Sequence, residues 1–191
     1  MNLEILLTIL MGIGLSAASG FRIFIPFLVI SIASITGNLT PADSFGWIGT
    51  YPALITFSIA TIIEIAAYYI PWVDNILDTI ASPAAVIAGM ILMAAVVSGM
   101  SPLLKWSLAI IAGGGIAGTI QVLTGVARVT SSLTTGGLGN SAVSSVESGS
   151  SLTLSALAIF APVIAGIVVT ALVVWAIKFL INRLAAKSKT P

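Results

Sequence analysis

The chain has 191 residues, of which 58% are hydrophobic and 7% are charged, and its formal net charge is +1. A soluble domain carries about 25% charged residues, so this composition excludes a soluble globular protein and indicates an integral membrane protein. The sequence has no cysteine and no histidine, which excludes disulfides, thiolate nucleophiles and histidine acid–base chemistry, and its near-neutral charge gives no basis for nucleic-acid binding.

Five apolar segments are long enough for a transmembrane helix, which needs about 20 residues to cross a bilayer. They cover residues 3–20, 52–70, 83–100, 103–122 and 154–181. The first has Glu4 but no Lys or Arg before its apolar run, so we expect it to remain as a helix and not to be a cleaved signal peptide.

Two further segments leave a choice between crossing the membrane and re-entering it. Residues 22–35 are apolar but short and contain Pro26, so they form either a sixth, tilted span or a re-entrant segment. Residues 123–135 leave the same choice between crossing and re-entering, with a weaker apolar signal. The polar segments 36–52 and 135–150 connect the spans, and the second is Gly/Ser-rich, which predicts a mobile, solvated loop.

The expected fold is therefore an all-α integral membrane protein of five to six transmembrane helices, forming one polytopic membrane domain over residues 1–191. The positive-inside rule predicts its orientation from basic residues at the end of the last span. These residues are Lys178, Arg183, Lys187 and Lys189. They predict a cytoplasmic C-terminus.

Tracing the chain backwards from a cytoplasmic C-terminus assigns a side to each connection. Residues 135–150 are then outside, Lys105 is inside, residues 71–78 are outside and residues 36–52 are inside. The N-terminus is inside if residues 22–35 cross the membrane and outside if they only dip into it.

The two halves of the chain show a faint repeat. A glycine cluster, a small-residue motif that ends in arginine, a TG turn, a span and a tryptophan follow one another in residues 1–80 and again in 103–185. Chance similarity between two Gly/Ala-rich apolar segments is the alternative explanation. If the repeat is real, residues 83–100 are a linker helix, and a dipping segment in each half makes the repeats inverted, as in many transporters, whereas full crossings make them parallel.

Arg22 and Arg128 close the matching motifs SGFR and TGVAR. An arginine within the bilayer is costly unless it reaches the headgroups, pairs with a carboxylate or faces water. The two arginines therefore either lie at helix ends or line a polar cavity between the halves, where they bind an anionic group or counter a carboxylate. Glu64, within the apolar run ITFSIATIIEIAAYY, is a candidate partner, and such a pair is either a structural clamp or part of a coupling site.

Three other polar residues are candidates for the same site. Asp74 and Asp78 are four residues apart after Pro71, so they share one helix face that either holds a cation or a polar headgroup or is simply solvated at the membrane interface. Gln121 lies within a span, where its amide needs a partner from another helix or from water.

Small residues recur at helical spacing in two spans. The stripes are Gly12, Ser16 and Gly20 in the first and Gly114 and Gly118 in the second. Such stripes let helix backbones approach closely in lipid, either within one chain or across a homo-oligomer interface.

The stretches SGFRIFIPF, residues 19–27, and PWVDNILDTIASPAAVIAG, residues 71–89, resemble a group of small bacterial integral membrane proteins, with plant relatives, classified as a domain of unknown function. The likeness extends over most of the chain, and TGVAR is a looser match. The resemblance implies Ser19, Gly20, Arg22, Asp74 and Asp78 as site residues and implies no activity.

Two functions follow as hypotheses. The first is a transporter or channel for a small solute or ion, with Arg22, Glu64, Asp74, Asp78, Gln121 and Arg128 at the interface of the half-repeats. The second is a non-transporting scaffold or lipid-binding subunit whose charges only hold helices together. Without histidine, cysteine or a catalytic motif, we expect no enzyme and no cofactor. The expected partners are membrane lipids and a small solute or ion.

Overall fold

The computed structural model describes residues 3–187, and within them the side chains of all except residues 71–76, 78, 180 and 183–187. Every regular element among the described residues is a helix, which confirms the all-α expectation. Its elements are α1 (Leu3–Phe21), α2 (Phe24–Ile35), the 3-10 helix η1 (Asp43–Gly49), α3 (Tyr51–Ala67), α4 (Pro71–Val96), α5 (Pro102–Leu108), the π-helical segment η2 (Ala109–Gly114), α6 (Gly115–Thr135), α7 (Asn140–Phe160) and α8 (Pro162–Lys187).

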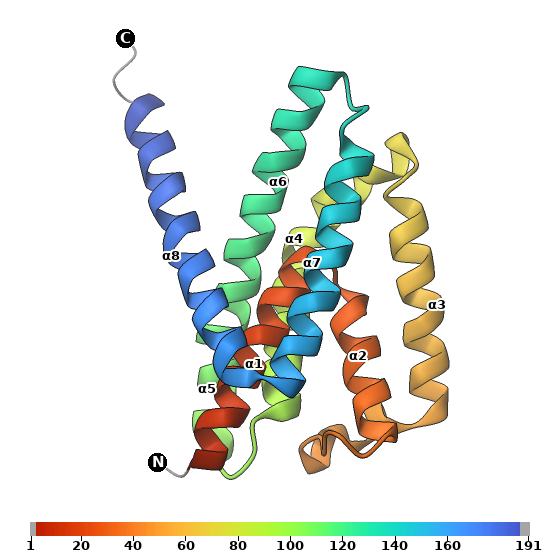
Figure 1. Cartoon of the computed structure of the whole chain (residues 1–191), viewed down its shortest axis with the longest axis vertical. Coiled ribbons are helices and arrows are strands. Elements are labelled where there is room, and N and C mark those ends of the chain that lie inside the picture. The colour runs from red at the N-terminus through yellow and green to blue at the C-terminus, as the bar shows by residue number, and fades with distance from the viewer. Residues whose placement is uncertain (1–2, 188–191) are drawn as a thin grey trace.

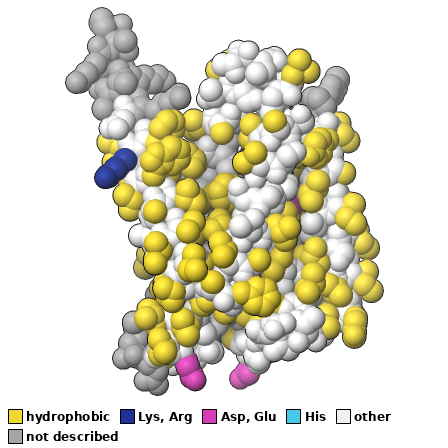
Figure 2. Space-filling model, in the orientation of Figure 1, with side chains coloured by type: hydrophobic (Ala, Val, Ile, Leu, Met, Phe, Trp, Pro, Cys, Tyr) yellow, Lys and Arg dark blue, Asp and Glu magenta, His cyan; other side chains and the backbone are white. Residues whose placement is uncertain are grey.

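The described helices meet the requirements of a multi-pass membrane protein. Four of them are long and apolar enough to cross a bilayer, and there are five if η1 and α3, which are bent by 67° relative to each other, count as one span. Large apolar side chains face outward along the bundle, including Ile55 and Ile59 on α3 and Ile164 and Ile167 on α8. Figure 2 shows hydrophobic side chains spread over the left and right sides of one face, with a paler stripe between them and acidic side chains at the lower end. Contact of such a surface with lipid is favourable, whereas exposure of so many apolar side chains to water would be unfavourable.

Helix α1 is the centre of the bundle. It packs against α4, α6, α7 and α8, while α2 packs against α3 and α7. Figure 1 shows that α1 rises from the lower end of the bundle and stops partway up, and that α2 then runs back to the lower end. The segment 22–35, for which the sequence left two possibilities, therefore turns back within the bundle beside α1.

The small-residue stripes explain how α1 lies so close to its neighbours. Ser16 Oγ donates a hydrogen bond to the Gly89 carbonyl of α4 at 2.9 Å, and a Cβ on Gly20 would lie 2.6 Å from the Ala117 carbonyl oxygen of α6. A Cβ on Gly12 would collide with Met93 of α4. In the second stripe, Gly114 and Gly118 face Val86 of α4. Both stripes thus contact helices of the same chain, and a homo-oligomer through them stays a prediction.

Prolines set several helix starts. Pro71, Pro102 and Pro162 are the first residues of α4, α5 and α8, where a missing backbone N–H removes no helical bond. The predicted span 154–181 is wrong, because the chain turns at Ala161 and a separate helix begins at Pro162. The span 83–100 likewise belongs to a longer helix that begins at Pro71 and contains Pro83.

The prediction of a mobile loop over residues 135–150 is also wrong. Only residues 136–139 form the turn, with Gly136 and Gly137 at positive φ, and α7 begins at Asn140. Because α7 and α8 are two helices, the turn at 136–139 and the C-terminal end of α8 lie at the same end of the bundle (Figure 1). The sequence-based orientation had placed them on opposite sides. It had also placed Lys105 on the side of the C-terminus, whereas α5, which carries Lys105, lies at the other end.

One element of the expected repeat is not matched in the second half. The chain turns back after Arg22 in the first half, whereas residues 123–135 continue α6 without a break. The inverted repeat and the division into halves 1–80 and 103–185 stay predictions. The linker residues 83–100 lie in α4 and the turn that follows it.

Candidate functional site

A short turn inside the bundle joins the end of α1 at Phe21 to the start of α2 at Phe24. The last helical bond of α1 runs from the Arg22 N–H to the Ala18 carbonyl at 3.1 Å. Pro26 prevents a continuous helix, because its ring would clash with the carbonyl of Arg22 four residues earlier and it has no N–H to donate. Ser151 of α7 donates its hydroxyl to the same Ala18 carbonyl at 2.9 Å, which ties the end of α1 to α7.

Arg22 is almost fully buried, with 1% of its surface exposed. Its Nη2 lies 3.2 Å from Glu147 Oε2 and donates to the Ser144 carbonyl at 3.1 Å. Its Nε donates to Ser148 Oγ at 3.2 Å, and its guanidinium carbon is 3.8 Å from the centre of the Tyr68 ring. One donor, Nη1, is buried and has no hydrogen-bond partner among the described atoms. Since buried donors are almost always paired, this nitrogen is an unusual, unsatisfied donor of the site.

Arg128 reaches the same carboxylate from α6. Its Nε donates to Glu147 Oε1 at 3.0 Å, and its Nη2 forms an ion pair with Oε2. Its guanidinium carbon is 4.2 Å from the centre of the Tyr68 ring. The two arginines, from different halves of the chain, therefore share one carboxylate and one aromatic ring. We call Arg22, Arg128, Glu147 and Tyr68 the arginine cluster.

Glu147 is the member of the arginine cluster that the sequence analysis did not identify, because it lies in the segment interpreted as a solvated loop. It is 3% exposed. Helix α7 carries a polar stripe toward the inside of the bundle, with buried residues at a spacing of three or four. The stripe consists of Ser144, Glu147, Ser151 and Ser155. That spacing is typical of one helix face and was available in the sequence.

Glu64 is buried beside the cluster and has a different partner from the one predicted. Its carboxylate oxygens accept hydrogen bonds from the backbone N–H groups of Ile23 at 2.8 Å and Phe24 at 3.0 Å. It thus caps the N-terminal end of α2, where the helix dipole favours a negative charge. Arg22 pairs with Glu147 instead of forming the expected Glu64–Arg pair.

The cluster lies inside the bundle. Arg128 is seven residues before the end of α6, and Glu147 is seven residues after the start of α7. At 1.5 Å per residue, both charges lie about 10 Å from the end of the bundle where the two helices meet.

The remaining predicted site residues do not join the cluster. Ser19 donates to the Ser16 carbonyl of its own helix, and Gly20 is a packing position. Gln121 is buried on the same face of α6 as Arg128 but two helical turns away, which is about 10 Å along the axis. The side chains of Asp74 and Asp78 lie outside the described residues.

Comparison with known proteins gives a family. No curated protein and no solved structure matches the chain. One family model matches residues 9–182, a span that contains the whole arginine cluster, and its description is "Domain of unknown function (DUF4126)". The chain therefore belongs to this family of domains of unknown function.

Proposed function

We propose that the protein transports a small anionic solute across the bacterial inner membrane, together with a proton. The observation that carries the proposal is the convergence of Arg22 and Arg128 on the carboxylate of Glu147 at the tip of a helix that ends within the bundle. Helix ends at this depth provide the solute and ion sites of many transporters. Charged residues inside a membrane most often mark transport pathways.

The carboxylate of Glu147 occupies the position that an anionic solute would take. Two guanidinium groups with planar donor arrays suit a carboxylate or another oxyanion, and Arg22 Nη1 offers one more donor. A solute that binds there has to displace Glu147. A displaced carboxylate without its arginines would be a buried, unpaired charge, and it avoids that cost by taking up a proton. Binding of the anion is therefore coupled to protonation of Glu147.

The proposal is tested by flux into proteoliposomes. Radiolabelled lactate and benzenesulfonate and, separately, chloride are supplied outside, with the external pH below the internal pH. We expect the wild type to accumulate at least one of these anions above the level of protein-free vesicles. Arg22→Gln and Arg128→Gln abolish accumulation, and Glu147→Gln abolishes its dependence on the pH gradient. Glu4→Gln, which changes an exposed charge at the far end of α1, leaves flux intact.

The second candidate is a non-transporting scaffold or lipid-binding subunit. It is favoured by the way Glu147 ties α1, α6 and α7 together through two ion pairs. If the folded wild type moves none of the three anions, while the arginine variants only unfold more readily, the cluster is a clamp and the transport proposal fails.

A further inference from the structure

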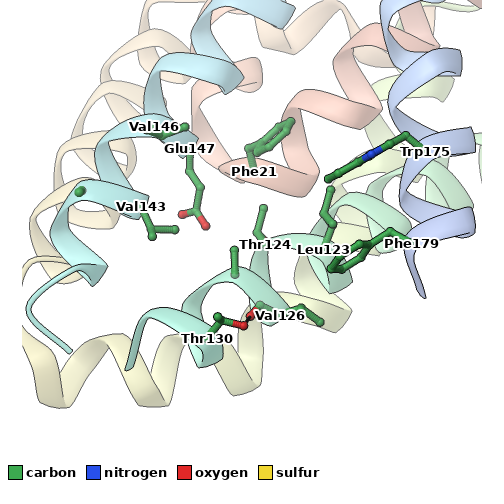
Figure 3. Close-up of a pocket in the computed structure, with 12 residues that line it drawn as sticks. Phe21, Leu123, Thr124, Val126, Thr130, Val143, Val146, Glu147, Trp175 and Phe179 are labelled. Carbon is green, nitrogen blue, oxygen red and sulfur yellow. Dashed lines mark hydrogen bonds between the residues drawn. The ribbon is translucent and has the colours of Figure 1, made fainter. Parts of the chain in front are cut away.

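An apolar groove lies between α6, α7 and α8, and Glu147 of the arginine cluster is one of the residues that line it. Its volume is about 650 Å³. We call it the α8 groove. Its walls include Phe21, Leu123, Val143, Val146, Trp175 and Phe179. Figure 3 shows Phe21, Trp175, Leu123 and Phe179 gathered on one side and Glu147 pointing into the space between α6 and α7. The groove is thus apolar along its length and carries a carboxylate at its inner end.

The α8 groove opens sideways to the surroundings of the bundle. Figure 1 shows α8 diverging from α6 and α7 toward the upper end. Two wall residues are strongly exposed, Trp175 at 55% and Val146 at 67%. The rings of Trp175 and Phe179 are stacked with their centroids 5.6 Å apart, so the two aromatic side chains of α8 support each other at the groove. In a membrane this opening faces lipid, and a molecule dissolved in the bilayer can enter it without passing through water.

The charges at the inner end select the kind of molecule. Among the residues that line the groove Glu147 is charged, and Arg22 and Arg128 hold its carboxylate from inside the bundle, so displacement of Glu147 leaves two guanidinium groups facing the one nearby carboxylate of Glu64. Once Glu147 has moved aside, an amphiphilic cation is repelled by the two arginines, and a wholly apolar molecule gains nothing from them. An amphiphilic anion gains both the apolar walls and two charge-assisted pairs.

We propose that the α8 groove binds the apolar body of an organic carboxylate whose charged group replaces Glu147 at Arg22 and Arg128. This inference rests on the proposed function and deepens it, because it names the substrate class as an amphiphilic organic carboxylate that enters from the lipid. The volume of the groove suits a drug-sized apolar body, since ligand pockets for such molecules measure about 300–1,000 Å³.

Trp175 provides a direct probe of the groove that does not depend on transport. The chain has four tryptophans, so Phe replacements of Trp47, Trp72 and Trp106 leave Trp175 as the only one. Fluorescence of this single-tryptophan protein is titrated in detergent with ω-bromoundecanoate, whose bromine quenches tryptophan on contact. The matched neutral probe is ω-bromoundecanol, which has the same chain length and no charge.

We expect saturable quenching by the carboxylate, with competition by undecanoate, and only weak quenching by the alcohol. Val146→Met and Val146→Phe narrow the mouth of the groove, and we expect them to weaken binding in order of side-chain size. Arg128→Gln weakens it about tenfold or more, because a charge-assisted hydrogen bond is lost. Ile63→Phe is the matched control, since Ile63 is similarly exposed but lines a separate groove between α2, α3 and α4.

Two results overturn the inference. In the first, the carboxylate and the alcohol quench Trp175 equally and no Val146 variant changes the quenching. This result indicates that both probes partition into the detergent. The other is quenching by a phospholipid brominated on its acyl chain that undecanoate does not displace, which assigns the groove to a bound lipid.

The transport proposal is judged separately. Saturable binding of undecanoate without flux of undecanoate into proteoliposomes leaves the groove assignment standing and rejects transport. Flux of lactate or chloride without carboxylate binding at Trp175 retains transport and rejects the groove as a substrate site.

Discussion

Arg22 and Arg128, which lie 106 positions apart in the chain, both bind Oε2 of Glu147 within the helix bundle. The shared atom means that α1, α6 and α7 are held by a single carboxylate. A buried ion pair is costly to form, yet removal of one member is more costly still because it leaves a charge without a partner. The stability of the bundle should therefore depend on Glu147 more than on either arginine.

Glu147→Gln should destabilise the protein by about 3–5 kcal/mol, because two buried arginines lose their carboxylate. Arg128→Gln should cost less, since Glu147 keeps its pair with Arg22. The double variant should be less destabilised than the sum of the two single losses, with a coupling energy of about 0.5–3 kcal/mol. Unfolding by SDS in mixed micelles measures all three, with Glu4→Gln as the control. Additive losses would show that the ion pair is not coupled and would contradict the shared-carboxylate arrangement.

Glu64 should hold the start of α2 in place. Glu64→Ala removes the acceptor for the N–H groups of Ile23 and Phe24, and the loss of such a cap costs about 0.5–2 kcal/mol. Hydrogen exchange at these two amides should accelerate, while exchange in the middle of α4 should not. Ser58→Ala, which removes a hydroxyl bonded only to the Leu54 carbonyl of the same helix, is the control on α3. Unchanged exchange at Ile23 and Phe24 would mean that Glu64 does not cap α2.

The sequence was sufficient to find Arg22, Arg128 and Glu64. Each is a charged residue in an apolar run, where burial without a partner is expensive, so their type and position alone marked them. Their partners depend on packing between distant segments, and sequence spacing carries no information on that. The Glu64–Arg pair was a reasonable expectation from charge, but the backbone N–H groups exposed at the α1–α2 turn offered Glu64 a closer partner.

Glu147 was missed because hydropathy averages over all faces of a helix. Helix α7 is polar on the side that faces α1, so its average resembles that of a solvated segment. Three serines and a glutamate at helical spacing would have revealed the inward face, but Gly136, Gly137 and Gly139 nearby suggested a loop throughout. The same error shifted the orientation, since a missing helix reverses the side of every segment before it.

Gly20 should tolerate no side chain. A Cβ there would lie 2.6 Å from both the Ala117 carbonyl oxygen and the Ile120 Cβ, closer than van der Waals contact. Gly20→Ala forces α1 away from α6, and overpacking of this kind costs about 1–3 kcal/mol. Gly115→Ala is the matched control in a helix, because its Cβ would meet nothing within 4 Å. There alanine should be neutral or stabilising by up to about 1 kcal/mol. Similar melting temperatures for the two variants would show that α1 and α6 are not in close contact.

The ends of the bundle can be assigned by cysteine labelling, since the natural chain contains no cysteine. Leu138, in the turn before α7, and Asn182, near the end of α8, are exposed at one end, and Thr40, after α2, is exposed at the other. Single cysteines at these positions are treated with a membrane-impermeant maleimide in sealed cells and in inverted vesicles. We expect Leu138→Cys and Asn182→Cys to react from the same side and Thr40→Cys from the opposite side.

This labelling pattern distinguishes two arrangements of the C-terminal third of the chain, the two helices α7 and α8 or a single span. If residues 154–181 formed a single span and residues 135–150 a loop, Leu138→Cys and Asn182→Cys would react from opposite sides. That outcome would remove α7 from the bundle and Glu147 from the arginines, and the site would have to be rebuilt around Arg22 and Glu64. Labelling of all three positions in detergent-permeabilised cells is the control, because it shows that each cysteine is reactive when it is accessible.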